Sequence, residues 1–257
     1  MKENLIKHIE KLNKNINNFE DEVTENSLIL LPLFQYSKFN NKTLSKKIES
    51  KLNSDNIKSL RYFNFNDYMT LSDKIDMYLS EFSDEIIEYL PENIDFQSIN
   101  FLLYELLINI YKHSKFNNAF IQINTSPNND EIEICIIDDG IGIIGSFNEE
   151  SIKYENDSDA IFKSINGTTT DKEKFNLHGR GLNTSARIAT LGFNGNMLIA
   201  SGKGICDINS NGAKTYYNPI EINGTFILLK LNNKKVDNLY ECIEYKTIDK
   251  IEGVNDD

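Results

Sequence analysis

Cysteine is scarce in this chain. Its 257 residues include only three cysteines, Cys135, Cys206 and Cys242, which are far apart and form no CxxC pair. A disulfide framework or a zinc site would need more cysteines at closer spacing. We therefore expect the three side chains to be small apolar fillers in a protein of a reducing compartment.

Long apolar runs are absent, and acidic residues outnumber basic residues. No stretch approaches the roughly 18 consecutive apolar residues of a membrane span. The opening residues, MKENLIKHIEKLNKN, lack the apolar segment of a signal peptide. Lys and Arg total 27 against 39 Asp and Glu, and this net charge of -12 disfavours general binding to nucleic acid or anionic membranes. These features predict a cytoplasmic protein with no nucleic-acid or membrane partner.

The rest of the composition is ordinary for a globular protein, and we distinguish three parts along the chain. Hydrophobic residues make up 40% and charged residues 26% of the chain, which is sufficient for a buried core. The sequence pattern of residues 1–95 predicts a segment of helices and strands, and we find no chemical motif in it. The apolar stripe of residues 2–20 within it fits docking on the domain, binding of a partner, or dimerisation. Residues 96–232 contain every motif described below. Residues 233–257 are rich in charge, and we expect them to form a loosely packed tail.

Residues 101–113 predict a helix with a broad apolar face. Apolar side chains recur there at three- and four-residue spacing. Glu105, Asn109 and His113 stand four residues apart, so they form a polar line along the same helix. Buried polar groups beside leucines need partners. From this helix alone, a solvent-facing stripe and a satisfied internal hydrogen-bonded pair both remain open.

An acidic turn follows the next predicted strands. Residues 119–124 and 131–137 have the pattern of strands, and Asp138 falls on the face that the isoleucines of the second strand share. The sequence then reads Asp-Asp-Gly-Ile-Gly up to Gly142, a DxGxG pattern. Because Asp-Gly pairs occur in ordinary turns, this signal is weak by itself.

Two further signals lie downstream. A polar stretch from Gly167 ends in Gly179-Arg180-Gly181, immediately before a predicted helix over 182–191. Glycines at a helix start let backbone N–H groups approach an anion, although an ordinary glycine-rich surface loop explains the stretch equally well. The last strong strand, residues 224–231, places Thr225 on its inward face. The pattern also predicts a short helix over 159–165, a strand over 195–201 and a hairpin turn at Asn211-Gly212.

The four signals occur in one order: Glu-x-x-x-Asn on a helix, DxGxG after a strand, a glycine-rich loop before a helix, and Gly-Thr on a late strand. This order and spacing resemble the GHKL ATPase superfamily over about residues 97–231. That family includes gyrase B, the ATP-driven heat-shock chaperones, MutL, histidine kinases and anti-sigma-factor serine kinases. The resemblance implies a Bergerat-type two-layer α/β sandwich, with a mixed, mostly antiparallel sheet covered by helices on one face, and ATP and Mg²⁺ as ligands.

The same resemblance assigns roles to individual residues. Asn109 is implied as the Mg²⁺ ligand, and Glu105 as the catalytic carboxylate that orients or deprotonates the nucleophile. Asp138 resembles the residue that accepts a hydrogen bond from the adenine amino group. For His113, a structural hydrogen bond is the expected role. The other implied nucleotide-binding positions, at the base and in a lid over residues 166–181, are Gly140, Gly142, Thr169, Lys172, Gly179, Arg180, Gly181, Leu182 and Thr225.

Departures from the family pattern narrow the expected function. Asn183 replaces the last glycine of the usual G-x-G-L-G, no upstream histidine matches a phospho-acceptor site, and no transducer segment follows residue 231. The chain is therefore most similar in style to stand-alone anti-sigma serine kinases, which implies transfer of the γ-phosphate to Ser or Thr of a separate, STAS-like protein. Two alternatives stay open. One is an ATP-hydrolysing switch that forms a homodimer, which the N-terminal helix favours, and the other is a non-catalytic nucleotide sensor.

Overall fold

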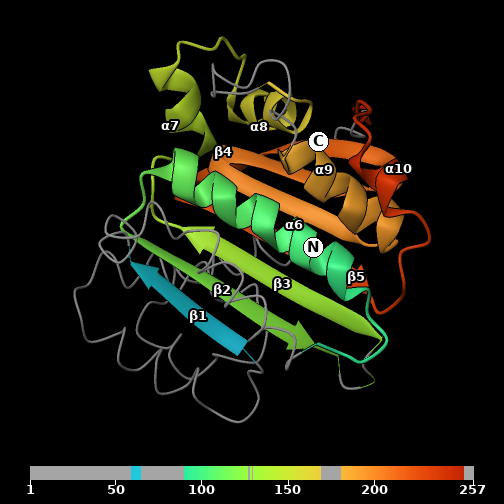
Figure 1. Ribbon diagram of the computed structural model, residues 1–257. Helices are drawn as coiled ribbons and strands as arrows, with labels where there is room; N and C mark the ends of the chain where they lie inside the picture. Colours follow the sequence, from blue (N-terminus) through green and yellow to red (C-terminus); the bar gives the residue numbers. More distant parts are fainter. Residues whose placement is uncertain (1–58, 65–89, 127, 129, 169–180, 252–257) are drawn as a thin grey trace.

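A five-stranded antiparallel sheet is the frame of the molecule in the computed structural model, which describes residues 59–64, 90–126, 128, 130–168 and 181–251 (Figure 1). Its strand order is β1-β2-β3-β5-β4, and every neighbouring pair is antiparallel. The strands are β1 (Ser59–Asn64), β2 (Asn118–Thr125), β3 (Glu131–Asp138), β4 (Asn196–Asn209) and β5 (Gly212–Asn232). Together with the helices, this sheet confirms the predicted mixed α/β class.

Helices cover the sheet, and two of them end in a π-helical turn. Figure 1 shows α6 and α9 crossing the same face of the sheet. Among the helices that the structure describes, none has the length and apolar character needed to cross a membrane. They are α6 (Phe96–Asn109) with its extension η4 (Ile110–Ser114), α7 (Gly142–Glu149), α8 (Asp157–Ile165), α9 (Gly181–Arg187) with its extension η6 (Ile188–Gly192), and α10 (Leu239–Ile243).

The core lies between α6 and the inner face of the sheet. Leu102 and Leu106 of α6 and Ile134 of β3 are fully buried in this layer. The helix begins where the Asp95 carboxylate accepts a hydrogen bond from the backbone N–H of Ser98 at 3.0 Å, which satisfies one of the free donors of the first turn. The helical and strand periodicities of the sequence therefore predicted this layer correctly.

The helix α7 was not predicted. It begins at Gly142, where the sequence indicated only the end of a turn, and Gly142 has a φ of +65°. Two glycines and the lack of a side-chain N-cap give this segment little intrinsic helical preference. Burial of Phe147, which is 2% exposed, stabilises the helix through tertiary contacts instead.

The hairpin of β4 and β5 is longer than its predicted strands. Asn209 pairs with Gly212, so the turn residues are Ser210 and Asn211, one position earlier than predicted. The ladder is irregular around Gly202, and there the Asp157 carboxylate at the start of α8 accepts a hydrogen bond from the N–H of Lys203 at 2.7 Å. The irregular stretch of β4 is therefore the place where α8 docks.

Residues 233–251 of the predicted charged tail are attached to the domain at a few points. Cys242 on α10 is 4% exposed, and all three cysteines are free and buried, as expected of small apolar side chains. Farther along, Ala213 at the start of β5 donates a backbone hydrogen bond to Asp249 at 2.8 Å and accepts one from Ile251 at 2.8 Å. The segment is rich in charged residues, so its sequence gave no indication of the few apolar and backbone contacts that attach it to the domain.

Candidate functional site

A cavity of about 450 Å³ opens between α6 with η4, the strands β3 and β5, α7, and the start of α9. All four sequence signals contribute to its wall. The predicted residues that line it are Glu105, Asn109, Asp138, Gly142, Gly181, Leu182 and Thr225, and His113 lines it as well. Gly140 contacts Asp138 through its N–H instead. Thr169, Lys172, Gly179 and Arg180 lie outside the described residues.

Asp138 contributes a buried carboxyl group to the cavity wall. It is 1% exposed, and its Oδ1 accepts a hydrogen bond from the N–H of Gly140 at 2.8 Å. Thr225, its register partner on β5, also donates hydrogen bonds to it. Burial is the main cause that raises its pKa from 3.8 to about 7, while the charge of Asp139 adds to the shift and the hydrogen bonds oppose it. Once ionised, this group can accept a hydrogen bond from an amino group of a ligand.

The two glycines of the DxGxG turn pack against the protein's own backbone. A Cβ at Gly140 would lie 1.9 Å from the carbonyl oxygen of Ser114, at the end of η4. A Cβ at Gly142 would lie 2.5 Å from the carbonyl oxygen of Gly224 and 2.5 Å from Oγ of Ser201. Side chains at these positions would separate the turn from α6 and from the sheet. The glycines thereby fix the position of Asp138 relative to the other residues of the cavity.

Glu105 and Asn109 meet the start of α9. A Cβ at Gly181 would lie 2.8 Å from Oε2 of Glu105 and 3.1 Å from Nδ2 of Asn109, so a side chain there would collide with this pair. Nδ2 of Asn109 is buried and has no hydrogen-bond partner among the residues that the structure describes. Buried amide groups are normally paired, so this atom marks a place where a bound ligand can supply an acceptor.

The oxygens of this pair suit a hard cation. Mg²⁺ prefers carboxylate and amide oxygens and is commonly held by one or two protein groups together with substrate phosphates. In the part of the chain that the structure describes, no cluster of three or more His, Cys, Asp or Glu could hold a metal by itself. A metal ion beside Asn109 therefore requires further oxygens from a ligand or from water.

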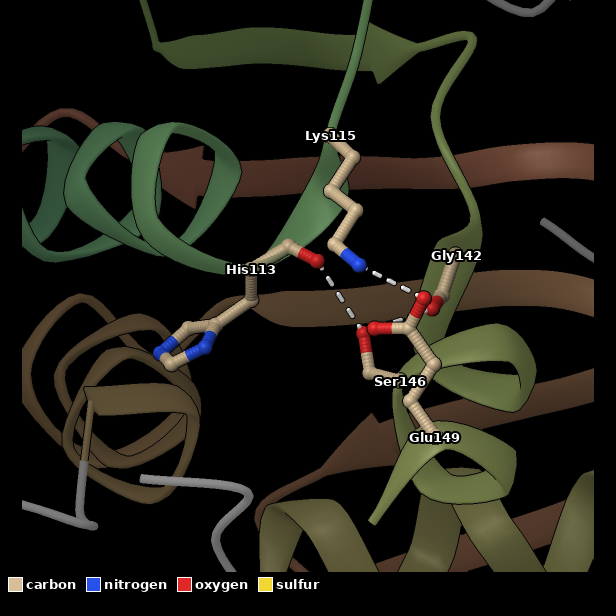
Figure 2. A network of polar contacts seen from close by, with 5 residues as sticks. All are labelled: His113, Lys115, Gly142, Ser146 and Glu149. Atoms are coloured by element: carbon tan, nitrogen blue, oxygen red, sulfur yellow. Dashed lines mark hydrogen bonds and ion pairs between the residues drawn. The ribbon is translucent and has the colours of Figure 1, made fainter. Parts of the chain in front are cut away.

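The α7 wall of the cavity is attached to the end of η4 (Figure 2). The hydroxyl of Ser146 lies 3.1 Å from the carbonyl oxygen of His113 and 3.0 Å from that of Gly142, and donates to these oxygens. Beside it, Lys115 and Glu149 form an ion pair of 2.6 Å. Figure 2 shows the imidazole of His113 pointing away from this network, so the backbone of His113, not its ring, joins α6 to α7.

Several residues of the wall were not predicted. Ser114 is 5% exposed, and its buried Oγ has no hydrogen-bond partner in the described part of the chain. Lys112 lies one helical turn after Asn109, so helical spacing could have indicated it. No feature of the sequence indicated the wall residues of α7 after Gly142, because the helix itself was not predicted. The unpredicted wall residues include Lys112, Ser114, Ile143, Ser146 and Phe147.

Comparison with known proteins adds no family assignment. No protein-family model matches the chain, and a search of curated proteins returns no match. The resemblance to the GHKL superfamily therefore rests on the motifs in the sequence. What the cavity binds has to be inferred from the chemistry of its wall.

Proposed function

We propose that this chain is a GHKL-type regulatory protein with a Bergerat-type fold, which binds Mg²⁺ and ATP in the cavity. We further propose that it transfers the γ-phosphate to a Ser or Thr of a separate, STAS-like protein, as an anti-sigma kinase does. The observation that carries the proposal is that four motifs far apart in the sequence line one cavity. Its volume of about 450 Å³ is in the range of small-molecule sites.

The Asp138 side of the cavity suits an adenine ring. The ionised carboxylate would accept a hydrogen bond from the exocyclic amino group, and the hydrogen bonds from Gly140 and Thr225 hold it in place for that contact. A flat heteroaromatic ring gains from burial against apolar side chains. The apolar side chains that line the cavity include Ile136, Ile143, Phe147 and Ile227.

The side with Glu105 and Asn109 suits the phosphates. The unpaired Nδ2 of Asn109 and the oxygens of both side chains fit a site that is completed by a phosphate group and a hard cation. When bound there, Mg²⁺ would neutralise charge on the phosphate oxygens. The chain would hold it through the amide oxygen of Asn109.

Glu105 is the proposed base of the transfer step. It takes the proton from the hydroxyl group of the acceptor as that oxygen attacks the γ-phosphorus. The bond from the γ-phosphorus to the bridging oxygen breaks, and ADP leaves with the electron pair. With water in place of a protein hydroxyl, the same step would be ATP hydrolysis.

Replacing Glu105 by glutamine is expected to reduce turnover by at least about 100-fold, since a positioned base typically contributes this much. The affinity for ATP should stay within about threefold, because glutamine has nearly the same shape. Glu221→Gln, at an exposed position of β5 that does not line the cavity, is the matched control and should retain turnover. Unchanged turnover in Glu105→Gln would remove the residue from the catalytic step.

The fate of the γ-phosphate identifies the acceptor. The full chain is incubated with Mg²⁺ and γ-labelled ATP, alone and with a lysate of its own cells. Label on one small protein with little free phosphate is the expected result. Free phosphate without labelled protein would instead indicate a hydrolysing ATPase, and tight binding with neither product would indicate a nucleotide sensor.

The affinity for adenosine is expected to fall as the pH is lowered through 7. Only the ionised form of Asp138 accepts the amino hydrogen, and its pKa is raised to about 7. Protonation should therefore weaken binding by about tenfold between pH 8 and pH 6. Adenosine is the suitable probe because it carries no phosphate that titrates in this range, and calorimetry or ligand-observed NMR measures the affinity. A flat profile would contradict the proposed contact with the base.

A further inference from the structure

The residues that follow β5 pack on the helices α9 and η6. We call residues 239–248, which comprise α10 and the chain after it, the C-terminal strap. Within the strap, α10 makes these contacts. Polar side chains from α9 and from the end of α8 hold the backbone of the strap, so its position is set by specific hydrogen bonds as well as by apolar contacts.

The first attachment is the buried guanidinium group of Arg187 on α9. Arg187 is 6% exposed, and its Nε donates to the carbonyl oxygen of Cys242 at 3.2 Å. Its Nη2 donates to the carbonyl oxygen of Glu241 at 2.6 Å. Both oxygens belong to the last turn of α10, where carbonyl groups lack helical partners and attract positive charge. The strap is therefore attached to the end of α9 by a charged pair of hydrogen bonds.

The second attachment is Asn183, in the first turns of α9. It is 1% exposed, and its Nδ2 donates to the carbonyl oxygen of Lys246 at 3.0 Å. Asn183 occupies the position of the last glycine in the G-x-G-L-G pattern of the family that the sequence resembles. Glycine has no side chain that could make this bond. The asparagine at this position therefore attaches the start of α9 to the strap.

The third attachment lies directly after α8, a helix that contacts α9. Asn166 donates from Nδ2 to the carbonyl oxygen of Ile248 at 3.1 Å and accepts from the N–H of Ile248 at 2.7 Å. The hydroxyl group of Tyr245 donates to the carbonyl oxygen of Asn166 at 2.8 Å. Thr168, two residues farther on, lines the cavity. The strap thus binds residues close in sequence to two lining residues of the cavity, Thr168 after α8 and Gly181 at the start of α9.

We propose that Asn183 and Asn166 are positioning residues, which hold Gly181 and Thr168 in place at the cavity through their shared attachment to the strap. Gly181 lies against Glu105 and Asn109, so a shift of α9 would change the space available to a phosphate group. The inference rests on the proposed binding of ATP and deepens it: the strap sets the affinity for the phosphate part of the ligand and leaves the adenine contact at Asp138 unaffected.

The test compares two ligands in the Asn183→Ala variant of the full chain. The affinity for ATP with Mg²⁺ is expected to fall by about three- to tenfold, the effect of losing one hydrogen bond. The affinity for adenosine should stay within about twofold. A role in overall stability alone would change both affinities together or neither. Tyr240→Ser is the matched control on the strap, because this side chain is 85% exposed, and it should retain both affinities.

The variant is expected to fold. Oδ1 of Asn183 is buried without a partner among the described residues, so removing it recovers part of the free energy lost with the hydrogen bond of Nδ2. Thermal unfolding checks this, and Asn166→Ala, measured in the same way, replaces the variant if it does not fold. Unchanged affinity for ATP, or an equal loss for ATP and adenosine, would overturn the positioning role alone. Failure of the unmodified chain to bind ATP would overturn the proposed function and this inference with it.

Discussion

Replacing Asp138 by asparagine is expected to weaken ATP binding by about 100-fold without loss of stability at pH 8. The affinity falls because a hydrogen bond to a charged acceptor contributes about 1.5–3 kcal/mol. In addition, the new amide has to present its NH₂ group either to the N–H of Gly140 or to the adenine amino group. Isothermal titration calorimetry with ATP and thermal unfolding at pH 8 and pH 5 measure the two effects.

The sign of the stability effect follows from the raised pKa of Asp138. The folded protein holds this proton more tightly than the unfolded chain, so ionisation of the group destabilises the fold. The destabilisation is absent below about pH 3.8, grows as the pH rises and is complete above about pH 7. Asparagine carries no such charge. The Asp138→Asn variant should therefore be at least as stable as the unmodified protein at pH 8, and this advantage should shrink toward pH 5.

Asp139 offers a matched control one position away. Its carboxylate accepts a hydrogen bond from the N–H of Asn117 at 2.7 Å, and it does not line the cavity. Asp139→Asn keeps an oxygen for that bond, so ATP affinity should stay within about threefold. Equal affinity in the Asp138→Asn variant and the unmodified chain would show that adenine does not bind at this carboxylate.

Periodic patterns predicted the elements whose own residues determine their structure. The helix over 101–113 and the strand over 131–137 each bury a face marked by regular apolar spacing, and both are present. The helix over 159–165 begins slightly earlier than predicted, where the side chain of Asn156 accepts a hydrogen bond from the N–H of Asp159 at 3.1 Å. In each case, local spacing and tertiary burial favour the same structure.

Elements stabilised by distant partners were not predictable from one sequence. α7 depends on the hydrogen bond from Ser146 to the carbonyl oxygen of His113 in η4 and on the burial of Phe147, and neither contact is visible as a pattern. The strap likewise depends on Arg187, which reads in the sequence as an ordinary basic residue near a helix end. Buried polar side chains that bind distant backbone groups leave no periodic signal.

The shared faces of the candidate residues could be predicted from the geometry of single elements. Placing Glu105 and Asn109 on one face of a helix needed only helical geometry, and placing Asp138 and Thr225 needed only the alternation of strands. These side chains now line one cavity. The part of the wall that α7 supplies was missed, because its contribution depends on how the chain turns after the DxGxG pattern.

Replacing Gly140 by alanine is expected to lower the free energy of unfolding by about 3 kcal/mol or more. The added methyl group would lie 1.9 Å from the carbonyl oxygen and 2.6 Å from the carbonyl carbon of Ser114, and backbone atoms cannot move aside as a flexible side chain can. Relief of the clash would break the hydrogen bond from the N–H of Ile141 to that oxygen, which is 2.7 Å long. Overpacking and a lost buried hydrogen bond are both destabilising.

Chemical denaturation measures this loss, and Gly192→Ala is the matched control. A methyl group at Gly192 would meet only side-chain atoms, those of Val236 at 3.3 Å and Cys242 at 3.5 Å, so we expect a change below about 1 kcal/mol. Any Gly140→Ala protein that folds should also bind ATP less tightly, because the turn that holds Asp138 is displaced. A Gly140→Ala variant as stable as Gly192→Ala would mean that the DxGxG turn does not pack on the end of η4, and the arrangement of the cavity would have to be revised.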